Sequence, residues 1–377
     1  MHESSSLAVW CKPKVVGVGT ALEVHVNYWR VENHPWLRTK ANFWRRDFIE
    51  IGLMLSSPAN VQNVAIFVPS KIKTTDVSDV SRQFSRQEIS HGIFNQPLTS
   101  THITNSALTA AHVRLQEANA PFCRVHEFIS TNGVISSSQL SLTPMAQGSL
   151  VRIEDDALTE ACRGLPAGEK VYFRLRIAIG DKTGSSMLQR IRVADKGLQS
   201  GYSQIEYLDF RLNEVRTLPS PVSAAMRMEN ASNSMIELIA FLAAVPVESD
   251  ILTYKTAASK SRILEHQIWN DYIGGNLPQG MVVYHWKKEA PGGSIEDFST
   301  FLKLQTRKSS WVTIFIYLSI ALAFGLAGNM LASYIQDRFK APERKPIPVV
   351  IRLAPGSRMG KAVVVTTLKN ESRDGQQ

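Results

Sequence analysis

One stretch near the N-terminus combines residue types that bind anions and flat rings. Between Tyr28 and Arg46, three tryptophans alternate with four arginines: Trp29, Arg30, Trp36, Arg38, Trp44, Arg45 and Arg46. Guanidinium groups bind phosphate through paired hydrogen bonds, and both side-chain types stack on nucleobases. The pattern predicts a binding site for an anionic ligand, a nucleotide or a nucleic acid. The alternative is structural, with tryptophans in core strands and arginines at a solvated or membrane-facing rim.

A second basic set is expected on one predicted hairpin. Its members are Arg174, Arg176, Arg190 and Arg192. Because alternate residues of a strand share a face, each pair is predicted to lie on one side of the sheet. Such a basic stripe would face anionic lipid headgroups, a partner protein or an anionic ligand.

Motifs for the common catalytic classes are absent from the sequence. Gly17 and Gly19 suggest a dinucleotide loop, but Leu22 occupies the third glycine position and strand-like residues follow. Cys123 and His126 have a spacing that places them on opposite faces of a strand, which excludes them as a metal-binding pair. We therefore expect no catalytic motif, metal or cofactor. The alternative is an enzyme site assembled from distant residues.

The longest uncharged stretch lies near the C-terminus, from Ser309 to Gln336. Its apolar part, 311–335, would form a helix roughly 37 Å long, which exceeds a hydrocarbon core of about 30 Å. We predict one transmembrane helix here, with a buried core helix as the alternative. A shorter apolar run, 235–247, contains Glu237 and Pro246 and is expected to be a buried helix.

Small and polar residues recur along the predicted transmembrane helix. Ala321, Gly325 and Asn329 follow one another at four-residue spacing, so they share one helical face. Small residues allow close helix packing, and an amide in lipid requires a hydrogen-bonding partner. The pattern predicts self-association of the helix, as a homo-oligomer or within a larger membrane complex. The alternative is a single anchor.

Charge and cysteine usage bear on membrane orientation. The 377-residue chain has 42 Lys plus Arg, 33 Asp plus Glu and a formal charge of +9. The basic tail, 336–377, would favour the cytoplasm by the positive-inside rule. However, three widely spaced cysteines (Cys11, Cys123 and Cys162) and an N-terminus unlike a signal peptide favour a cytoplasmic body. We expect a plasma (inner) membrane protein with its body inside and its tail outside; the reverse is the alternative.

Alternating apolar and polar residues predict most of the strands. They are expected at 22–29, 48–55, 61–68, 122–129, 150–153, 171–179, 187–193, 208–212 and 281–286. Helices are expected at 76–91, 234–244, 261–273 and 294–310. Residues 1–12 are expected to be a mobile end, and the acids at 154–156 to lie in a solvated loop.

These elements predict a mainly β, sandwich-like fold with some α structure and one C-terminal transmembrane helix. The expected divisions are an N-terminal β-rich domain (1–135), a second β domain (136–225), an α/β segment (226–293), a juxtamembrane helix (294–310), the transmembrane helix (311–335) and the tail (336–377).

Three functions remain open from the sequence. The first is a single-pass membrane sensor or scaffold subunit whose body binds a partner. The second is a ligand-gated effector that perturbs the membrane. The third is a membrane-tethered enzyme without a recognisable motif.

Overall fold

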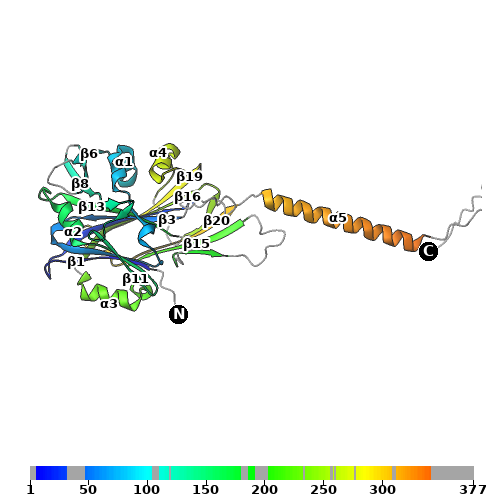
Figure 1. The fold of residues 1–377 in the computed structure, drawn as a ribbon, viewed down its shortest axis with the longest axis horizontal. Helices are drawn as coiled ribbons and strands as arrows, with labels where there is room; N and C mark the ends of the chain where they lie inside the picture. The colour runs from blue at the N-terminus through cyan, green and yellow to red at the C-terminus, as the bar shows by residue number, and fades with distance from the viewer. Residues whose placement is uncertain are drawn as a thin grey trace, which may run out of the picture. The chain divides into compact units, whose positions relative to one another are not determined.

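Runs of apolar and β-branched residues form long strands that assemble into two large mixed sheets (Figure 1). The computed structural model describes residues 6–31, 47–103, 110–118, 120–179, 186–191, 203–231, 234–254, 258, 260–275, 277–307 and 311–340. The chain divides into two units, a body through Thr313 and a second unit from Ile314 onward.

The first sheet has eight strands among the described residues. Their order is β11-β12-β4-β1-β15-β20-β17, with β14 beside β15. The strands are β1 (Ser6–Pro13), β4 (Val61–Val68), β11 (Leu140–Met145), β12 (Gly148–Ile153), β14 (Leu188–Ile191), β15 (Ser203–Leu212), β17 (Ser249–Tyr254) and β20 (Phe298–Arg307). Most neighbours are antiparallel, but β1 and β15 are parallel.

The second sheet has ten strands in the same described ranges. Their order is β18-β19-β16-β2-β3-β13-β8-β7-β6, with β5 beside β13. The strands are β2 (Thr20–Trp29), β3 (Phe48–Leu55), β5 (Val77–Asp79), β6 (Leu98–Ile103), β7 (His112–Glu117), β8 (Ala120–His126), β13 (Lys170–Ala178), β16 (Ser234–Pro246), β18 (Lys260–Ile263) and β19 (Met281–Glu289). Parallel pairs join β2 to β16 and β8 to β13.

Short elements complete the body. A small hairpin, β9 (Ser130–Thr131) and β10 (Val134–Ile135), turns at Asn132 and Gly133, whose φ angles of 52° and 76° are left-handed. The helices of the body are α1 (Gln87–Phe94), α2 (Asp155–Cys162), α3 (Ser220–Met228) and α4 (His266–Ile273), with 3-10 turns η3 (Pro58–Asn60), η4 (Thr74–Asp76), η5 (Ser81–Ser85) and η6 (Val215–Thr217).

The main core cluster draws buried side chains from both sheets. Val9 and Ile66 come from the first sheet, and Val26, Ile51 and Phe173 come from the second. Separate clusters form on other faces of the sheets. Trp29 and Phe48 pack against α4, whereas Trp10 and Phe67 pack against α3. The central strands are therefore covered on both faces, which explains why β3 is buried along its whole length.

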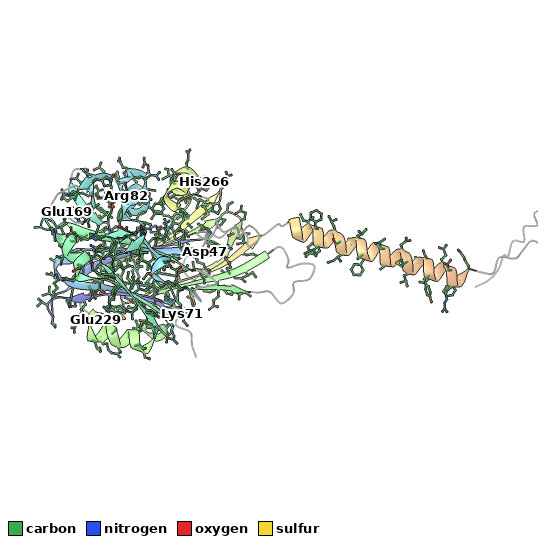
Figure 2. The ribbon with its side chains drawn as sticks, in the orientation of Figure 1. Asp47, Lys71, Arg82, Glu169, Glu229 and His266 are labelled. Carbon is green, nitrogen blue, oxygen red and sulfur yellow. The ribbon has the colours of Figure 1, made fainter. Side chains whose placement is uncertain are left out.

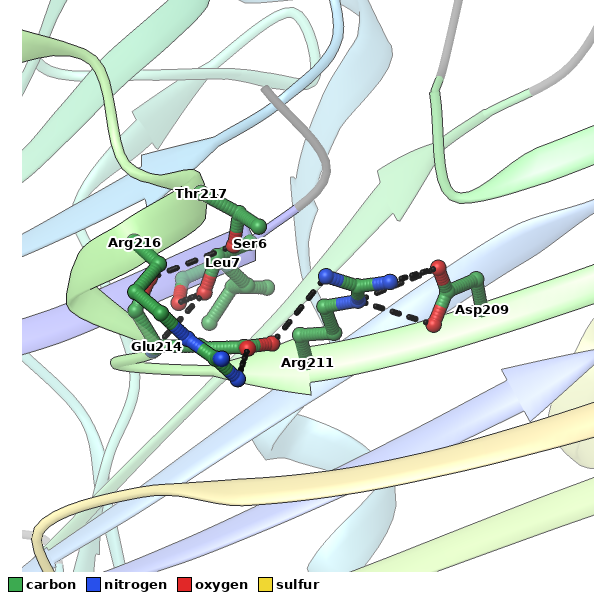
Figure 3. A network of polar contacts seen from close by, with 7 residues as sticks. All are labelled: Ser6, Leu7, Asp209, Arg211, Glu214, Arg216 and Thr217. Atoms are coloured by element: carbon green, nitrogen blue, oxygen red, sulfur yellow. Dashed lines mark hydrogen bonds and ion pairs between the residues drawn. The ribbon is translucent and has the colours of Figure 1, made fainter. Parts of the chain in front are cut away.

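A polar network fastens the start of β1 to the end of β15 (Figure 3). Arg211 donates to Asp209 at 2.8–3.1 Å and pairs with Glu214 at 3.2 Å. The Glu214 amide donates to the Ser6 hydroxyl at 3.1 Å, and the Glu214 carboxylate also pairs with Arg216. This network stabilises the parallel register, in which Ser6 lies opposite Arg211.

The strand predictions for 48–55 and 61–68 are confirmed, as is the end of a helix at Gly274, whose φ is 91°. The helix predictions for 76–91 and 261–273 hold only in part, because 77–79 form β5 and 260–263 form β18. Four other predictions are wrong. Residues 6–13 form the interior strand β1, 234–246 form β16, 298–307 form β20 in place of a juxtamembrane helix, and the acids at 155–156 begin α2.

Strand pairing also crosses the predicted domain boundaries within the body. Strand β2 pairs with β16, and β3 pairs with β13, so segments from 1–135, 136–225 and 226–293 share one sheet. These segments do not form separate domains, because removing one would leave the neighbouring strands unpaired.

Gly52 lies where the Tyr172 ring crosses β3. A Cβ atom at position 52 would lie 1.9 Å from the Tyr172 hydroxyl oxygen and 2.6 Å from Cζ. We predict that Gly52→Ala lowers the free energy of unfolding by about 1–3 kcal/mol through overpacking. Chaotrope unfolding of the full chain in detergent measures this. Gly293→Ala is the control, because its nearest contact would be 3.5 Å; equal losses in both variants would contradict the prediction.

Candidate functional site

The structure does not describe most of the predicted aromatic and arginine site. Trp36, Arg38, Trp44, Arg45 and Arg46 lie outside the described residues, as does Arg192. Trp29 and Arg30 are described, and their side chains are buried, with relative exposures of 1% and 3%. Trp29 therefore fits the structural alternative, in which the tryptophans lie in core strands, and Arg30 is also buried in the core instead of lying at a rim.

Trp29 belongs to an aromatic cluster between β2 and α4. Its ring centroid lies 6.0 Å from that of Phe48, 5.5 Å from that of Trp269 and 6.2 Å from that of Tyr272. These contacts explain its burial, because a large aromatic surface stabilises the fold most when it is removed from water. The ring offers no free face for stacking a ligand.

Arg30 joins the end of β2 to three strands of the other sheet. Its guanidinium pairs with Glu206 of β15 at 2.8 Å. It also donates to Thr306 of β20 at 2.6 Å and to Ser249 of β17 at 3.1 Å. Arg30 therefore holds together the end of the body at which β20 finishes, one residue after Thr306.

Asp47 closes the same end of the second sheet (labelled in Figure 2). Its carboxylate accepts the Val31 amide at 3.0 Å and the Tyr28 hydroxyl at 3.3 Å. Its carbonyl oxygen accepts the Ile179 amide at 2.8 Å. The last residues of β2 and the first of β3 are thereby fixed.

The predicted basic stripe on a sheet surface is wrong for Arg174 and Arg176. Strand β13 pairs with β3, whereas β14 belongs to the other sheet, so no hairpin joins them. Arg174 and Arg176 do share a face of β13, as predicted. However, that face is buried: the Arg174 side chain has 0% exposure and that of Arg176 17%.

Both arginines bind one buried carboxylate, Glu50 of β3. Arg174 pairs with Glu50 at 2.7 Å, and Arg176 donates to its other oxygen at 2.9 Å. The Tyr272 hydroxyl of α4 donates to Glu50 at 2.8 Å, and Arg174 donates to the Tyr172 hydroxyl at 2.9 Å. We call these five residues the Glu50 cluster. The arrangement follows from register, because Glu50 lies directly opposite Arg176.

Electrostatics keep Glu50 ionised despite its burial. Burial raises the pKa of a carboxyl group, but Arg174 and Arg176 outweigh this effect and the pKa of Glu50 is lowered. Burial raises the pKa of Tyr172 to about 12, and also raises that of Tyr272, so both phenols remain protonated donors. The Glu50 cluster thus contains two cations and one anion.

Arg176 connects the Glu50 cluster to the end of α4. It donates to the carbonyl oxygens of Tyr272 at 3.2 Å and Ile273 at 3.4 Å. A cation is favourable at a helix C-terminus, where carbonyl groups lack partners. The Arg176 guanidinium also lies 4.4 Å from the Phe48 ring centroid.

His25 extends the hydrogen-bonded chain toward the surface. Its Nδ1 lies 3.4 Å from the Tyr172 hydroxyl oxygen, and the imidazole is neutral. Burial lowers the pKa of His25 to about 3, with a further contribution from the nearby Arg174. Every charged group of the Glu50 cluster is paired within the protein, so we assign the cluster a structural role.

Metal binding finds no support within the described part of the chain, where no three His, Cys, Asp or Glu residues are placed to share an ion. Sequence analysis identified Arg174 and Arg176 but missed Glu50, whose signal is a single carboxylate in the otherwise apolar sequence of Phe48–Leu55. Its partners come from distant segments, which sequence spacing does not reveal.

The second unit contains α5 (Trp311–Phe339), which includes Ala321, Gly325 and Asn329 on its exposed surface. From Ile314 to Phe339 this helix has a mean hydropathy of 2.0 in its most apolar window, and none of that window is buried. By length and composition it can cross a membrane.

No known protein family matches this sequence, and comparison with curated proteins gives no significant match. The function must therefore be argued from the residues described above.

Removal of the buried charge on Glu50 tests the structural role of the Glu50 cluster. We predict that Glu50→Gln lowers the free energy of unfolding by about 3–5 kcal/mol, because Arg174 stays buried without its counter-charge. Chaotrope unfolding of the full chain in detergent, followed by tryptophan fluorescence, measures the loss.

The control is Glu265→Gln, which breaks the exposed pair between Arg262 and Glu265 (2.8 Å). We expect a loss of less than about 1 kcal/mol there. If both variants were equally stable, the Glu50 cluster would not have the role assigned to it.

Proposed function

We propose that this protein is a single-pass, membrane-anchored sensor or scaffold subunit whose β-rich body binds a partner. The observation that carries the proposal is α5, whose most apolar window has no buried residue and which begins four residues after β20 ends. Such a helix is stable in a bilayer, where its backbone groups are satisfied internally and its side chains face lipid.

The exposed side chains of α5 argue against water as its surroundings. Phe315, Leu322, Phe324 and Met330 have relative exposures of 63%, 66%, 75% and 74%. Soluble monomers rarely expose contiguous apolar surface of this extent. Arg338 and Lys340, which follow the apolar stretch, are suited to a headgroup region.

Cysteine placement supports a cytoplasmic body at the inner membrane. Cys11 and Cys123 are both free and lie in different core clusters, so they are not placed to form a disulfide with each other. Burial raises the pKa of both thiols and keeps them unreactive. A body built in this way suits a reducing compartment, and the tail would then lie outside.

We further propose that α5 associates with a second copy or with another helix of a membrane complex. Ala321 and Gly325 let helices approach closely, and Asn329 requires a hydrogen-bonding partner in lipid. Anionic lipid headgroups are the ligand that we propose for the predicted basic residues other than Arg30, Arg174 and Arg176, because these three are paired inside the body. A nucleic acid is the less favoured ligand, because Trp29 and Arg30 are occupied within the core.

A second function, a ligand-gated effector that perturbs the membrane, is favoured by one contact. Arg30 binds Thr306, one residue before the end of the strand that leads to α5. A change in the body at Arg30 would therefore reach a strand that ends four residues before α5 begins in the chain. Growth arrest on overproduction of the full chain, relieved by removing residues 309–336, would select this function over the scaffold.

Deletion of the apolar helix tests membrane anchoring. We predict that the full chain stays in the membrane fraction after alkaline carbonate washing, whereas a variant lacking 309–336 is released, because it has lost its lipid-facing surface. A variant lacking the tail, 341–377, is the control and should remain bound. A full chain that is monodisperse in buffer without detergent would overturn the proposal.

Crosslinking in membranes tests association of the helix. We predict that Gly325→Leu with Asn329→Leu reduces the crosslinked oligomer, because the close packing and the amide contact are lost. Ala327→Leu is the matched control, since residue 327 lies on the opposite face of the helix. Identical oligomer ladders in all three proteins would show that this face is not the interface.

A further inference from the structure

Two buried histidines face each other at the outer part of the second sheet. His112 begins β7 and His126 ends β8, and the two are direct partners in the antiparallel register. The adjacent pair exchanges a backbone hydrogen bond from Glu127 to Ala111, so the histidines form a non-hydrogen-bonded pair, in which side chains approach most closely. Their ring centroids are 5.1 Å apart, and neither residue is exposed.

The surroundings of the two rings are mainly apolar. The Phe128 and Phe173 ring centroids lie 5.2 Å and 5.4 Å from that of His126. None of the four imidazole nitrogens makes a hydrogen bond of normal geometry among the described residues, and the nearby Gln139 side chain favours a proton on His126. A buried polar group without a partner is unfavourable, and a buried charge is much more so.

The charged groups around the pair do not favour a proton on it. From β8, Arg124 adds positive charge, and from α2, Glu160 adds negative charge that is already paired with Arg163 at 3.1 Å. On β7, Arg114 is paired with Glu169 at 3.1 Å. The other neighbours of His126 are uncharged: Phe128 after β8, Gln139 before β11 and Phe173 of β13.

The same groups hold α2 against the sheet. Arg124 donates to the carbonyl oxygens of Ala161 at 3.1 Å, Arg163 at 2.7 Å and Gly164 at 2.9 Å, at the end of α2. Glu160 of α2 accepts the amide of Ala110, two residues before His112, at 3.2 Å. Positive charge on the histidine pair would act directly on Arg124 and on Glu160, the two side chains that attach α2 to the sheet.

We propose that His112, His126 and α2 form an acid-sensitive latch. When the pair takes up protons, the two imidazolium groups repel each other and Arg124, and α2 and the first residues of β7 separate from the sheet. The latch is closed while both rings are neutral. It does not depend on membrane anchoring, and it would make the body responsive to the pH of its compartment.

The direction of the pH effect follows from the protonation of the closed state. Burial lowers the pKa of His112 to about 4 and, together with the charge of His112, that of His126 to about 3. The opened state has ordinary histidines and binds more protons below pH of about 6.5. The closed latch is therefore most stable above that pH and loses stability as the pH falls toward 4.

One neighbouring acid has the opposite effect. Asp79 of β5 accepts the Phe128 amide at 2.8 Å, and burial raises its pKa to about 6. Because the closed state favours the protonated form of Asp79, acid stabilises the structure through this group. Substitutions at the histidines are needed to separate the two contributions.

Hydrogen exchange of the full chain in detergent, from pH 7.5 to pH 5, tests the latch. After correction for the intrinsic pH dependence of exchange, we expect amides of α2 and β7 to open more readily at pH 5, by up to about 30-fold for each imidazole. The double variant His112→Phe with His126→Phe should lose this dependence, while the exposed His102→Phe control should retain it.

The proposal is overturned if corrected exchange in α2 and β7 does not change with pH, or if the double variant keeps the wild-type dependence. Should the double variant fail to fold, nuclear magnetic resonance titration of the wild-type imidazoles decides the question. Midpoints near 6.5 for both rings, with α2 still protected, would show that the pair accepts protons without opening.

Discussion

The buried carboxylate of Glu50 determines the arrangement of a large part of the body. Taking its charge out of water is favourable only because Arg174 and Arg176 lie on the neighbouring strand and Tyr272 donates from α4. The pairing fixes the register of β3 against β13 and the position of α4. Through the close approach of Gly92 to Trp269, the position of α4 in turn sets that of α1. A buried ion pair adds little net stability over apolar packing, so its main contribution here is to select one arrangement.

Arg30 and Glu206 act in the same way between the two sheets. Their pair, with Ser249 and Thr306, joins the end of β2 to β15, β17 and β20. Neither buried pair offers a free charge to a ligand. The arginines that suggested phosphate binding in the sequence are instead paired with carboxylates inside the body. Each network contains one buried carboxylate, and its partners come from separate elements: β13 and α4 for Glu50, and β15, β17 and β20 around Arg30.

Sequence patterns predicted elements that are bounded by a clear turn or stop residue. The run from Phe48 to Leu55 was recognised as a strand because it is bounded by a clear turn, and α4 because Gly274 ends it. Strand β16 was mistaken for a helix because its residues from Leu238 to Val245 are all apolar, so the sequence lacks the alternation that marks a strand. The shared face of Arg174 and Arg176 was predictable, but its burial was not. It depends on Glu50, more than a hundred residues earlier, and on α4, nearly a hundred residues later, and local spacing holds no information about either.

The parallel pairs have a consequence for biosynthesis. Ser6 lies opposite Arg211, and Thr20 lies opposite Ser234. Strands β1 and β2 therefore cannot pair with β15 and β16 until about 200 further residues have been synthesised. The last strand, β20, immediately precedes the apolar helix in the chain. The body therefore completes its sheets at about the time when α5 is synthesised, so the last step of sheet assembly coincides with the appearance of an exposed apolar helix. Long-range pairing of this kind is slow, so the nascent body needs protection from aggregation until β20 is in place.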